Sequence, residues 1–167
     1  MPRLSGYSME RLWAPWRIKY VSVKKQRGCI FCSSLKSGLG GYVIFKNRYS
    51  FCLLNLFPYN NGHILVSPKR HVRELSLLKD AEILDLFKSM NKAREVLNKV
   101  LKPNGFNIGI NIAEAAGAGV TGHLHIHIVP RWRGDTNFMP VLYGTKVISQ
   151  SLQDLHRILK KACSIKN

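Results

Sequence analysis

Residues 123–131 read His-Leu-His-Ile-His-Ile-Val-Pro-Arg, so that three histidines are separated by single apolar residues. On a β-strand, alternate side chains point to opposite faces. His123, His125 and His127 would therefore share one face, while the leucine and isoleucines between them bury the other. A helix cannot produce this arrangement, because residues two apart on a helix do not face the same way. The pattern predicts a half-buried strand that presents three imidazoles, each able to act as acid, base, nucleophile or metal ligand near neutral pH.

Half of the six histidines of the chain lie within this stretch. Histidines that merely fill a hydrogen-bonded position in a core do not cluster in this way. The clustering favours two functions, catalysis and metal binding, and the spacing alone does not choose between them.

A second group of reactive side chains is the C-x-x-C pair formed by Cys29 and Cys32. In a reducing compartment such a pair indicates metal binding or redox chemistry. A tetrahedral structural zinc site would need two further ligands, for which His63, His71 and the three strand histidines are available. Residues 29–41 are rich in serine and glycine and are predicted to form a loop. A thioredoxin-like role is less favoured, because no helix is predicted to open at Cys32. Cys52 lies in an apolar run and is predicted to be a core residue.

The length of 167 residues predicts a single domain over 1–167, with an N-terminal arm over 1–28 and a C-terminal tail and helix over 132–167. Trp13 and Trp16 are predicted to anchor the arm. Charged residues interrupt the N-terminus, and the sequence contains no apolar run of transmembrane length. We therefore expect a cytoplasmic protein with no membrane partner.

The net charge of +17 favours anionic partners such as nucleotides, polyphosphates or nucleic acid. The basic residues are spread along the chain and form no basic tail. Nucleic acid is therefore a less favoured partner than a nucleotide.

Hydrophobic periodicity predicts strands at 43–46, 50–55, 62–67, 106–112 and 123–131, a long helix at 78–101 and a final helix near 149–162. His156, in the final helix, is predicted to lie at the surface. The order of strands, helix, strands and helix predicts an α+β fold. In it, an antiparallel sheet carries the long helix and the C-terminal helix on one side.

A glycine-rich stretch at 115–122 directly precedes the first histidine. Gly117, Gly119 and Gly122 allow backbone N–H groups to approach an anion without obstruction by Cβ. Beside three imidazoles, this loop predicts a phosphate group held against a nucleophile.

Taken together, these features resemble the histidine-triad (HIT) family of nucleotide-binding proteins, over roughly residues 10–160. Residues 123–131 match its signature, residues 62–71 resemble its second block, and Cys29-Ile30-Phe31-Cys32 resembles the zinc-binding members. Residues 13–17 (Trp-Ala-Pro-Trp-Arg), 116–119 and 130–138 resemble the branch of bacterial diadenosine polyphosphate phosphorylases and hydrolases.

The resemblance implies a fold of the HIT type and a role for each matching residue. His125 would attack the α-phosphorus and carry a nucleotidyl-histidine intermediate. His127 and the backbone of Gly119–Gly122 would hold phosphate oxygens, Asn55 would bind the ribose hydroxyls, and His63 would orient the site from behind. Zinc would be held by the side chains of Cys29, Cys32, His71 and His123.

The chain departs from the phosphoramidate-hydrolase branch of the family, which has a Gln-Ser pair just before the histidines. Gly119 and Val120 occupy the matching positions. Thr121 would then supply the hydroxyl, and Asn111 the nearby amide. Trp132 and Phe138 would lie near the nucleotide or the dimer seam.

The implied activity is that of a nucleotidyl hydrolase or transferase that works as a homodimer. The implied substrates are dinucleoside polyphosphates such as diadenosine tetraphosphate, cleaved by hydrolysis or phosphorolysis. One alternative is an enzyme that removes AMP from phosphoramidates or adenylated nucleic-acid ends. The other is a non-enzymatic, zinc-stabilised nucleotide-binding module.

Overall fold

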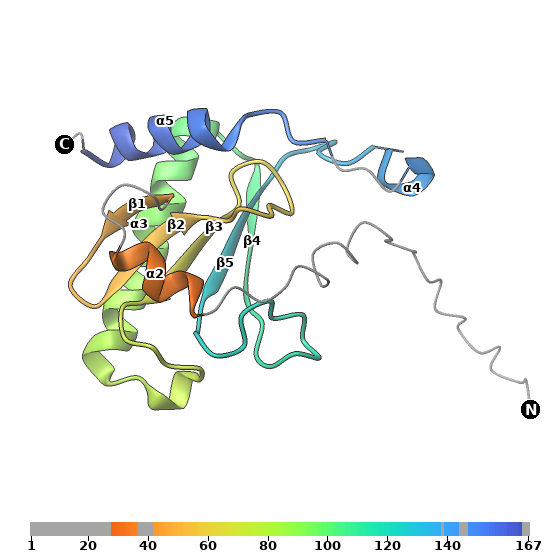
Figure 1. The fold of residues 1–167 in the computed structure, drawn as a ribbon. Coiled ribbons are helices and arrows are strands. Elements are labelled where there is room, and N and C mark those ends of the chain that lie inside the picture. The colour runs from red at the N-terminus through yellow and green to blue at the C-terminus, as the bar shows by residue number, and fades with distance from the viewer. Residues whose placement is uncertain (1–27, 37–41, 138, 144–146, 165–167) are drawn as a thin grey trace, which may run out of the picture.

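The computed structural model describes residues 28–36, 42–137, 139–143 and 147–164. The helices and strands follow one another as α2 (Ile30–Lys36), β1 (Val43–Lys46), β2 (Ser50–Leu54), β3 (Ile64–Pro68), the 3-10 turn η1 (Leu75–Leu77), α3 (Asp80–Leu101), β4 (Gly105–Ile110), β5 (Ile126–Arg131), α4 (Met139–Tyr143) and α5 (Leu152–Ser164) (Figure 1). The predicted N-terminal arm with Trp13 and Trp16 lies outside the described residues, as does Phe138.

Within the described residues, five strands form one sheet in the order β1-β2-β3-β5-β4, and all neighbouring strands are antiparallel. The predicted α+β architecture with an antiparallel sheet is confirmed. Every residue of β2 and β3 is buried, because these inner strands are covered on both faces. The edges of the sheet are β1 and β4.

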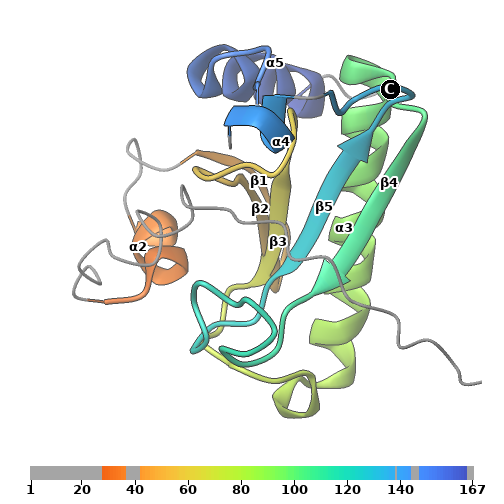
Figure 2. The ribbon, with the colours of Figure 1, turned by 90° about the vertical axis from the view of Figure 1, so that its right-hand side faces the viewer.

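The larger core lies between one face of the sheet and the helices α3 and α5. Leu86 and Leu97 of α3 and Leu159 of α5 are completely buried there, against the even-numbered apolar residues of β2, β3 and β5. Figure 2 shows α3 along this face and α5 across one end of the sheet. Among the described residues, no helix is long and apolar enough to cross a bilayer.

The predicted C-terminal helix begins later than expected, at Leu152, because the Ser151 hydroxyl accepts a hydrogen bond from the backbone N–H of Asp154 (3.1 Å). The prediction that His156 lies at the surface is wrong. Its ring is half-buried and packs edge-on against Tyr42, while Nε2 donates to the Val43 carbonyl (2.9 Å). A partner more than a hundred residues away cannot be read from local periodicity.

The prediction that residues 29–41 form a loop is also wrong over its first half, where α2 forms. The Ser33 N–H donates to the Cys29 carbonyl (3.0 Å) at the start of this helix, and Phe31 is buried against Phe51, Leu53 and Leu65. A helix of this length depends on tertiary packing for its stability. Figure 2 shows α2 on the opposite side of the sheet from α3. The two predicted helices do share one side, since α3 and α5 both pack in the larger core.

The strand predicted at 123–131 pairs with its neighbours only from Ile126 onward. Before that point the backbone of Leu124 is bonded elsewhere: its N–H donates to the Val72 carbonyl (2.6 Å), and its carbonyl accepts from the Ser67 hydroxyl (2.8 Å). The predicted alternation nevertheless holds, since Leu124, Ile126 and Ile128 all lie in the larger core.

Candidate functional site

A row of aromatic rings lies on the face of the sheet that carries α2. His123, His125 and His127 are all buried on this face. The Phe31 ring of α2 packs against His123 (centroids 5.0 Å apart) and His125 (4.9 Å). The row continues from His125 to His127 (4.9 Å). The structure therefore brings the three predicted histidines together under one helix.

At one end of this row, four ligand-type atoms approach one another: the sulfurs of Cys29 and Cys32 and one ring nitrogen each of His71 and His123. All four lie within 4.8 Å of one another. The Nδ1 atom of His123 is 3.2 Å from the Cys29 sulfur and 3.6 Å from the Cys32 sulfur, and Nδ1 of His71 is 3.4 Å from the Cys32 sulfur. This group could hold a metal ion.

The spacing of these atoms fits an ion with tetrahedral coordination. Bond lengths of about 2.3 Å to sulfur and 2.1 Å to nitrogen place neighbouring ligands roughly 3.5 Å apart, which is close to the sulfur–nitrogen distances in the site. The Nε2–H of His123 donates to the Pro68 carbonyl (2.9 Å), which leaves the lone pair on Nδ1, the atom that faces the sulfurs. The donor set and the tautomer of His123 thus both fit a metal.

The segment that carries His71 is fixed by its neighbour Arg70. The Arg70 guanidinium donates to both carboxylate oxygens of Glu82 (2.9 and 2.6 Å), and Glu82 also accepts from the Lys79 N–H at the start of α3 (2.9 Å). The hydrogen bond from Arg70 is the main reason that the pKa of Glu82 is lowered to about 2. The carboxylate therefore stays charged and links this segment to α3.

A helix does begin at Ile30, next to Cys29, so the prediction that no helix opens at the C-x-x-C pair is wrong, and a redox-active pair stays open on that ground. Burial, with the neighbouring Cys29 adding to the effect, raises the pKa of the Cys32 thiol, so its surroundings do not activate Cys32 as a thiolate. Two imidazole nitrogens also face the sulfurs, which favours metal binding.

The hydrogen bonds of His125 determine its tautomer. Its Nδ1 lies 2.8 Å from the carbonyl oxygen of His123, an atom that can only accept, so the ring proton is on Nδ1. The lone pair is then on Nε2. Burial lowers the pKa of His125, and the bond to the His123 carbonyl acts against that shift. His125 is accordingly a neutral imidazole near pH 7, with one nitrogen suited to nucleophilic attack.

The tautomer of His127 is fixed by a chain of hydrogen bonds that begins in the turn between β2 and β3. The backbone N–H of Tyr59 donates to Nδ1 of His63 (3.0 Å), so Nε2 of His63 carries the proton and donates to Nδ1 of His127 (3.0 Å). The remaining proton of His127 must be on Nε2. That atom is buried and has no hydrogen-bond partner among the described residues. A buried N–H donor without a partner is costly, and a ligand oxygen would satisfy it.

Gly62 allows His63 to take this position. Its φ of +75° is in the left-handed region, and a Cβ there would lie 2.5 Å from Cδ1 of Leu101. His63 itself is completely buried. Burial, with the neighbouring imidazoles adding to the effect, lowers the pKa of His63 to about 3 and that of His127 to about 4.

These pKa values predict a loss of folding stability in acid. Both histidines titrate near their ordinary value of about 6.5 in the unfolded chain, so from there down to about pH 3–4 the unfolded state binds more protons. The free energy of unfolding is therefore highest above about pH 6.5 and decreases as the pH falls below that value. Urea unfolding of the wild type and of His63→Gln tests this: between pH 7.5 and pH 5 the wild type should lose roughly 1–2 kcal/mol more than the variant. An equal loss in both would contradict the assigned cause.

Asn55 lies beside His63, at the end of β2. Its Nδ2 is 3.2 Å from Nδ1 of His63, and its Oδ1 accepts from the Phe57 N–H (3.0 Å). The structure thus brings Asn55 to the histidine row, and its predicted contact with ribose hydroxyls stays a prediction.

The glycine-rich loop enters the site beside the metal-binding group. Gly119, Thr121 and Gly122 are exposed, and a Cβ on Gly122 would come within 3.7 Å of Nε2 of His71. Asn111 reaches back to the loop, with Nδ2 3.4 Å from the Gly117 carbonyl. The predicted phosphate contacts of this loop stay predictions.

Two residues that border the histidines were missed in the sequence. Phe31 separates the cysteines in the C-x-x-C motif, and any side chain between two chelating residues must lie near their ligands. Tyr59 stacks on His127 (5.7 Å, interplanar angle 10°) besides fixing the tautomer of His63. It lies in a segment whose sequence predicts only a turn, and no local signal distinguishes it.

Comparison with known proteins assigns the family. The HIT domain model matches residues 40–134, which is more than half of the chain. A protein of Mycobacterium tuberculosis (strain CDC 1551 / Oshkosh) named AP-4-A phosphorylase is 38% identical over 161 residues, which cover 90% of this chain and 83% of that protein. The chain belongs to the HIT domain family.

A second HIT relative is the asymmetrical bis(5'-nucleosyl)-tetraphosphatase of Schizosaccharomyces pombe, 37% identical over 109 residues, or 65% of this chain and 59% of that protein. Family membership and these two enzyme names confirm the prediction of an enzyme. Among solved structures, a hypothetical histidine triad nucleotide-binding protein of Sulfolobus tokodaii strain 7 has a TM-score of 0.67, with 27% identity and coverage of 81% of this chain and 91% of that chain. A Zn-bound histidine triad family protein of Mycobacterium smegmatis, 24% identical, has the same fold (TM-score 0.66; 81% and 93% covered).

Proposed function

We propose that this HIT protein cleaves dinucleoside polyphosphates, such as diadenosine tetraphosphate, through a nucleotidyl intermediate on His125. The observation that carries the proposal is the pairing of two complementary groups on adjacent rings. His125 has a lone pair on Nε2, and His127 has a buried N–H on its own Nε2 without a partner among the described residues. Transfer of a nucleotidyl group requires both a nucleophile that attacks phosphorus and a hydrogen-bond donor to the phosphoryl oxygens. The names of the two enzyme relatives support the choice of substrate.

In the first step, Nε2 of His125 attacks the α-phosphorus, and the bond from phosphorus to the bridging oxygen breaks. The leaving nucleotide takes the electron pair of that bond. The imidazole becomes a cation, which the carbonyl of His123 stabilises through the Nδ1–H hydrogen bond. The N–H of His127 would donate to the phosphoryl oxygens, where negative charge increases in the transition state.

In the second step, water or inorganic phosphate attacks the phosphorus of the intermediate, and the bond to Nε2 breaks. The electron pair returns to His125, and the proton of the attacking group leaves to solvent. Two displacements at one histidine replace a single difficult one. Water yields AMP and phosphate yields ADP.

We further propose that Cys29, Cys32, His71 and His123 hold zinc. Four protein ligands would leave no open position, which is typical of structural rather than catalytic zinc. The ion would tie α2 to His123, two residues before the nucleophile. Its contribution would be rigidity, because His125 keeps its own Nε2 for phosphorus.

The proposed function is tested by product analysis with diadenosine tetraphosphate, in the absence and presence of inorganic phosphate. We expect ATP in both reactions, with AMP as the second product of hydrolysis and ADP as that of phosphorolysis. Quenching during turnover with denaturant at alkaline pH, where the phosphorus–nitrogen bond is stable, should also give protein that is heavier by one adenylate group, attached to His125. Two molecules of ADP as the only products without added phosphate, or no cleavage at all, would contradict the proposal.

We also propose that two copies of the chain pair along β4. This strand lies at the edge of the sheet, where Ile108 and, just beyond it, Ile112 are exposed. Asp85 and Ser89 of α3 contact the β1–β2 side, so Ile83 and Phe87, on the other flank of that helix, lie toward β4. Both of these apolar residues are exposed as well. An exposed edge strand with an apolar flank is suited to pairing with a second copy.

The variant Ile108→Asp tests this pairing, because it places a charge in the centre of the proposed interface. We expect a wild-type dimer and a variant whose dissociation constant is at least about 100-fold higher, measured by analytical ultracentrifugation. Leu77→Asp, which changes a similarly exposed leucine elsewhere, is the matched control and should remain a dimer. If the wild type is a monomer, or if Ile108→Asp leaves the dimer intact, β4 is not the interface.

A further inference from the structure

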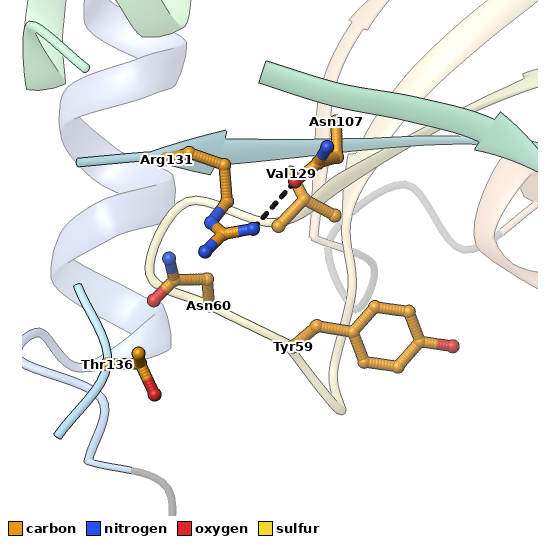
Figure 3. Close-up of a pocket in the computed structure, with 6 residues that line it drawn as sticks. All are labelled: Tyr59, Asn60, Asn107, Val129, Arg131 and Thr136. Atoms are coloured by element: carbon orange, nitrogen blue, oxygen red, sulfur yellow. Dashed lines mark hydrogen bonds between the residues drawn. The ribbon is translucent and has the colours of Figure 1, made fainter. Parts of the chain in front are cut away.

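A pocket of about 360 Å³ lies beyond His127, toward β4 (Figure 3). It is lined by Tyr59 and Asn60 from the β2–β3 turn, Asn107 from β4, Val129 and Arg131 from β5, and Thr136. Its volume falls in the range of small-ligand sites, about 300–1,000 Å³. None of its lining residues has a role in the site described above except Tyr59.

The pocket adjoins the end of the histidine row at His127. Val129 and Arg131 follow His127 at two-residue spacing on β5, so the three side chains share one face of the sheet. Asn107 lies directly opposite Val129 in the β4–β5 ladder and brings its amide to the same face. The ring of Tyr59 stacks on His127 at the other boundary. A ligand held at the histidines could therefore extend into the pocket past Tyr59.

The charge of the pocket argues against a bare phosphate group as its occupant. Arg131 donates from Nε and Nη2 to the two carboxylate oxygens of Asp135 (2.6 and 2.9 Å) and from Nη1 to Oδ1 of Asn107 (2.8 Å). The carboxylate of Asp135 is nearly buried and neutralises the guanidinium. Figure 3 shows the bond between Arg131 and Asn107 across the pocket.

The remaining lining groups suit a neutral, planar ligand with several hydrogen-bonding atoms. They are the Nδ2 donor of Asn107, the Oδ1 acceptor of Asn60, whose NH2 group already donates to the Pro130 carbonyl and Asp135, and the hydroxyl of Thr136. An amide donor, an amide acceptor and a hydroxyl can together bond base edges or ribose hydroxyls. A nucleoside has these properties, whereas a phosphate chain does not.

We propose that this pocket binds the second nucleoside of the substrate, the one that departs with the leaving polyphosphate. The inference rests on the proposed function. The phosphates between the two nucleosides would cross the face of Tyr59, with the α-phosphorus at His125. The pocket would then make the enzyme prefer a dinucleotide to a nucleoside polyphosphate that ends in a free phosphate.

The test measures binding in the His125→Ala background, where we expect turnover to be too slow to deplete either ligand. Calorimetry compares diadenosine tetraphosphate with adenosine tetraphosphate, which lacks only the second nucleoside. Thr136→Phe fills the pocket from an exposed position, and Gln153→Phe places the same ring at an exposed position on α5 as the matched control. We expect Thr136→Phe to lower the preference for the dinucleotide about tenfold, the effect of roughly one or two lost hydrogen bonds. The control should leave the preference unchanged.

The proposal is wrong if Thr136→Phe affects both ligands equally, or if the parent protein binds them with the same affinity. Asn107→Ser, a small change on an edge strand, provides a second variant with the same expectation should Thr136→Phe fail to fold. Turnover by the wild type is measured separately. A protein that shows the expected binding preference but cleaves neither compound would overturn the proposed reaction and leave the pocket supported.

Discussion

Replacing His125 with alanine is expected to reduce the turnover of diadenosine tetraphosphate by a factor on the order of 10⁴ or more, the scale seen when a catalytic nucleophile is lost. The reason is that no other described ring combines a free lone pair with a position beside the N–H of His127. His123 directs its lone pair to the cysteines, and the Nδ1 atoms of His63 and His127 each accept a hydrogen bond within the protein. The measurement is single-turnover cleavage with chromatographic analysis of the products.

The control for this variant is His156→Ala, which removes a half-buried histidine outside the site, whose Nε2 bonds the Val43 carbonyl on the α5 side of the molecule. We expect this variant to keep the wild-type rate. His125→Ala should also retain the bound metal and the ability to bind nucleotide, because neither depends on its Nε2. Turnover within tenfold of the wild type in His125→Ala would show that the nucleophile lies elsewhere. Loss of binding together with turnover would show that the variant had disturbed the whole site.

The sequence predicts the histidine face well because its signal is local. Alternation along 123–131 needs only the geometry of a strand, and Leu124, Ile126 and Ile128 do enter the core. The same holds for α3, whose apolar spacing persists over many turns and predicts its bounds to within two residues. The ends of strands are predicted less well. Leu124 hydrogen-bonds to Val72 and not to a neighbouring strand, so β5 begins only at Ile126.

The parts that the sequence does not predict depend on distant partners. The helix α2 is too short for a periodic signal and is stabilised by the burial of Phe31 against β2 and β3. The tautomer of His127 depends on a backbone N–H in the β2–β3 turn. The pocket beyond His127 requires the register of β4 against β5 and the position of Asn60, whose amide is held by the Pro130 carbonyl and Asp135. All of these contacts join residues that are far apart in the sequence, so local sequence patterns do not predict them.

The proposed zinc site leads to the second large effect. Elemental analysis of protein purified without chelator should find about one zinc per chain. Removing the metal should lower the melting temperature by roughly 10 °C. Binding at about 1,000 times the dissociation constant stabilises the fold by about 4 kcal/mol, and each kcal/mol corresponds to about 2–4 °C for a chain of this size. The loss of structure should be concentrated in α2, because the proposed metal attaches this helix to the rest of the site through Cys29 and Cys32.

Cys29→Ser should reproduce the effect of the chelator, and adding chelator to that variant should change little further. Cys163→Ala is the matched control, since this half-buried cysteine lies in α5 and outside the group of four ligand atoms. It should keep both the zinc and the response to chelator. Turnover should fall in the apo protein through misplacement of His125, because the ion holds His123 and His123 in turn provides the carbonyl that fixes the His125 tautomer. An apo protein with an unchanged melting temperature, or a Cys29→Ser variant that still binds one zinc per chain, would refute the assigned ligand set.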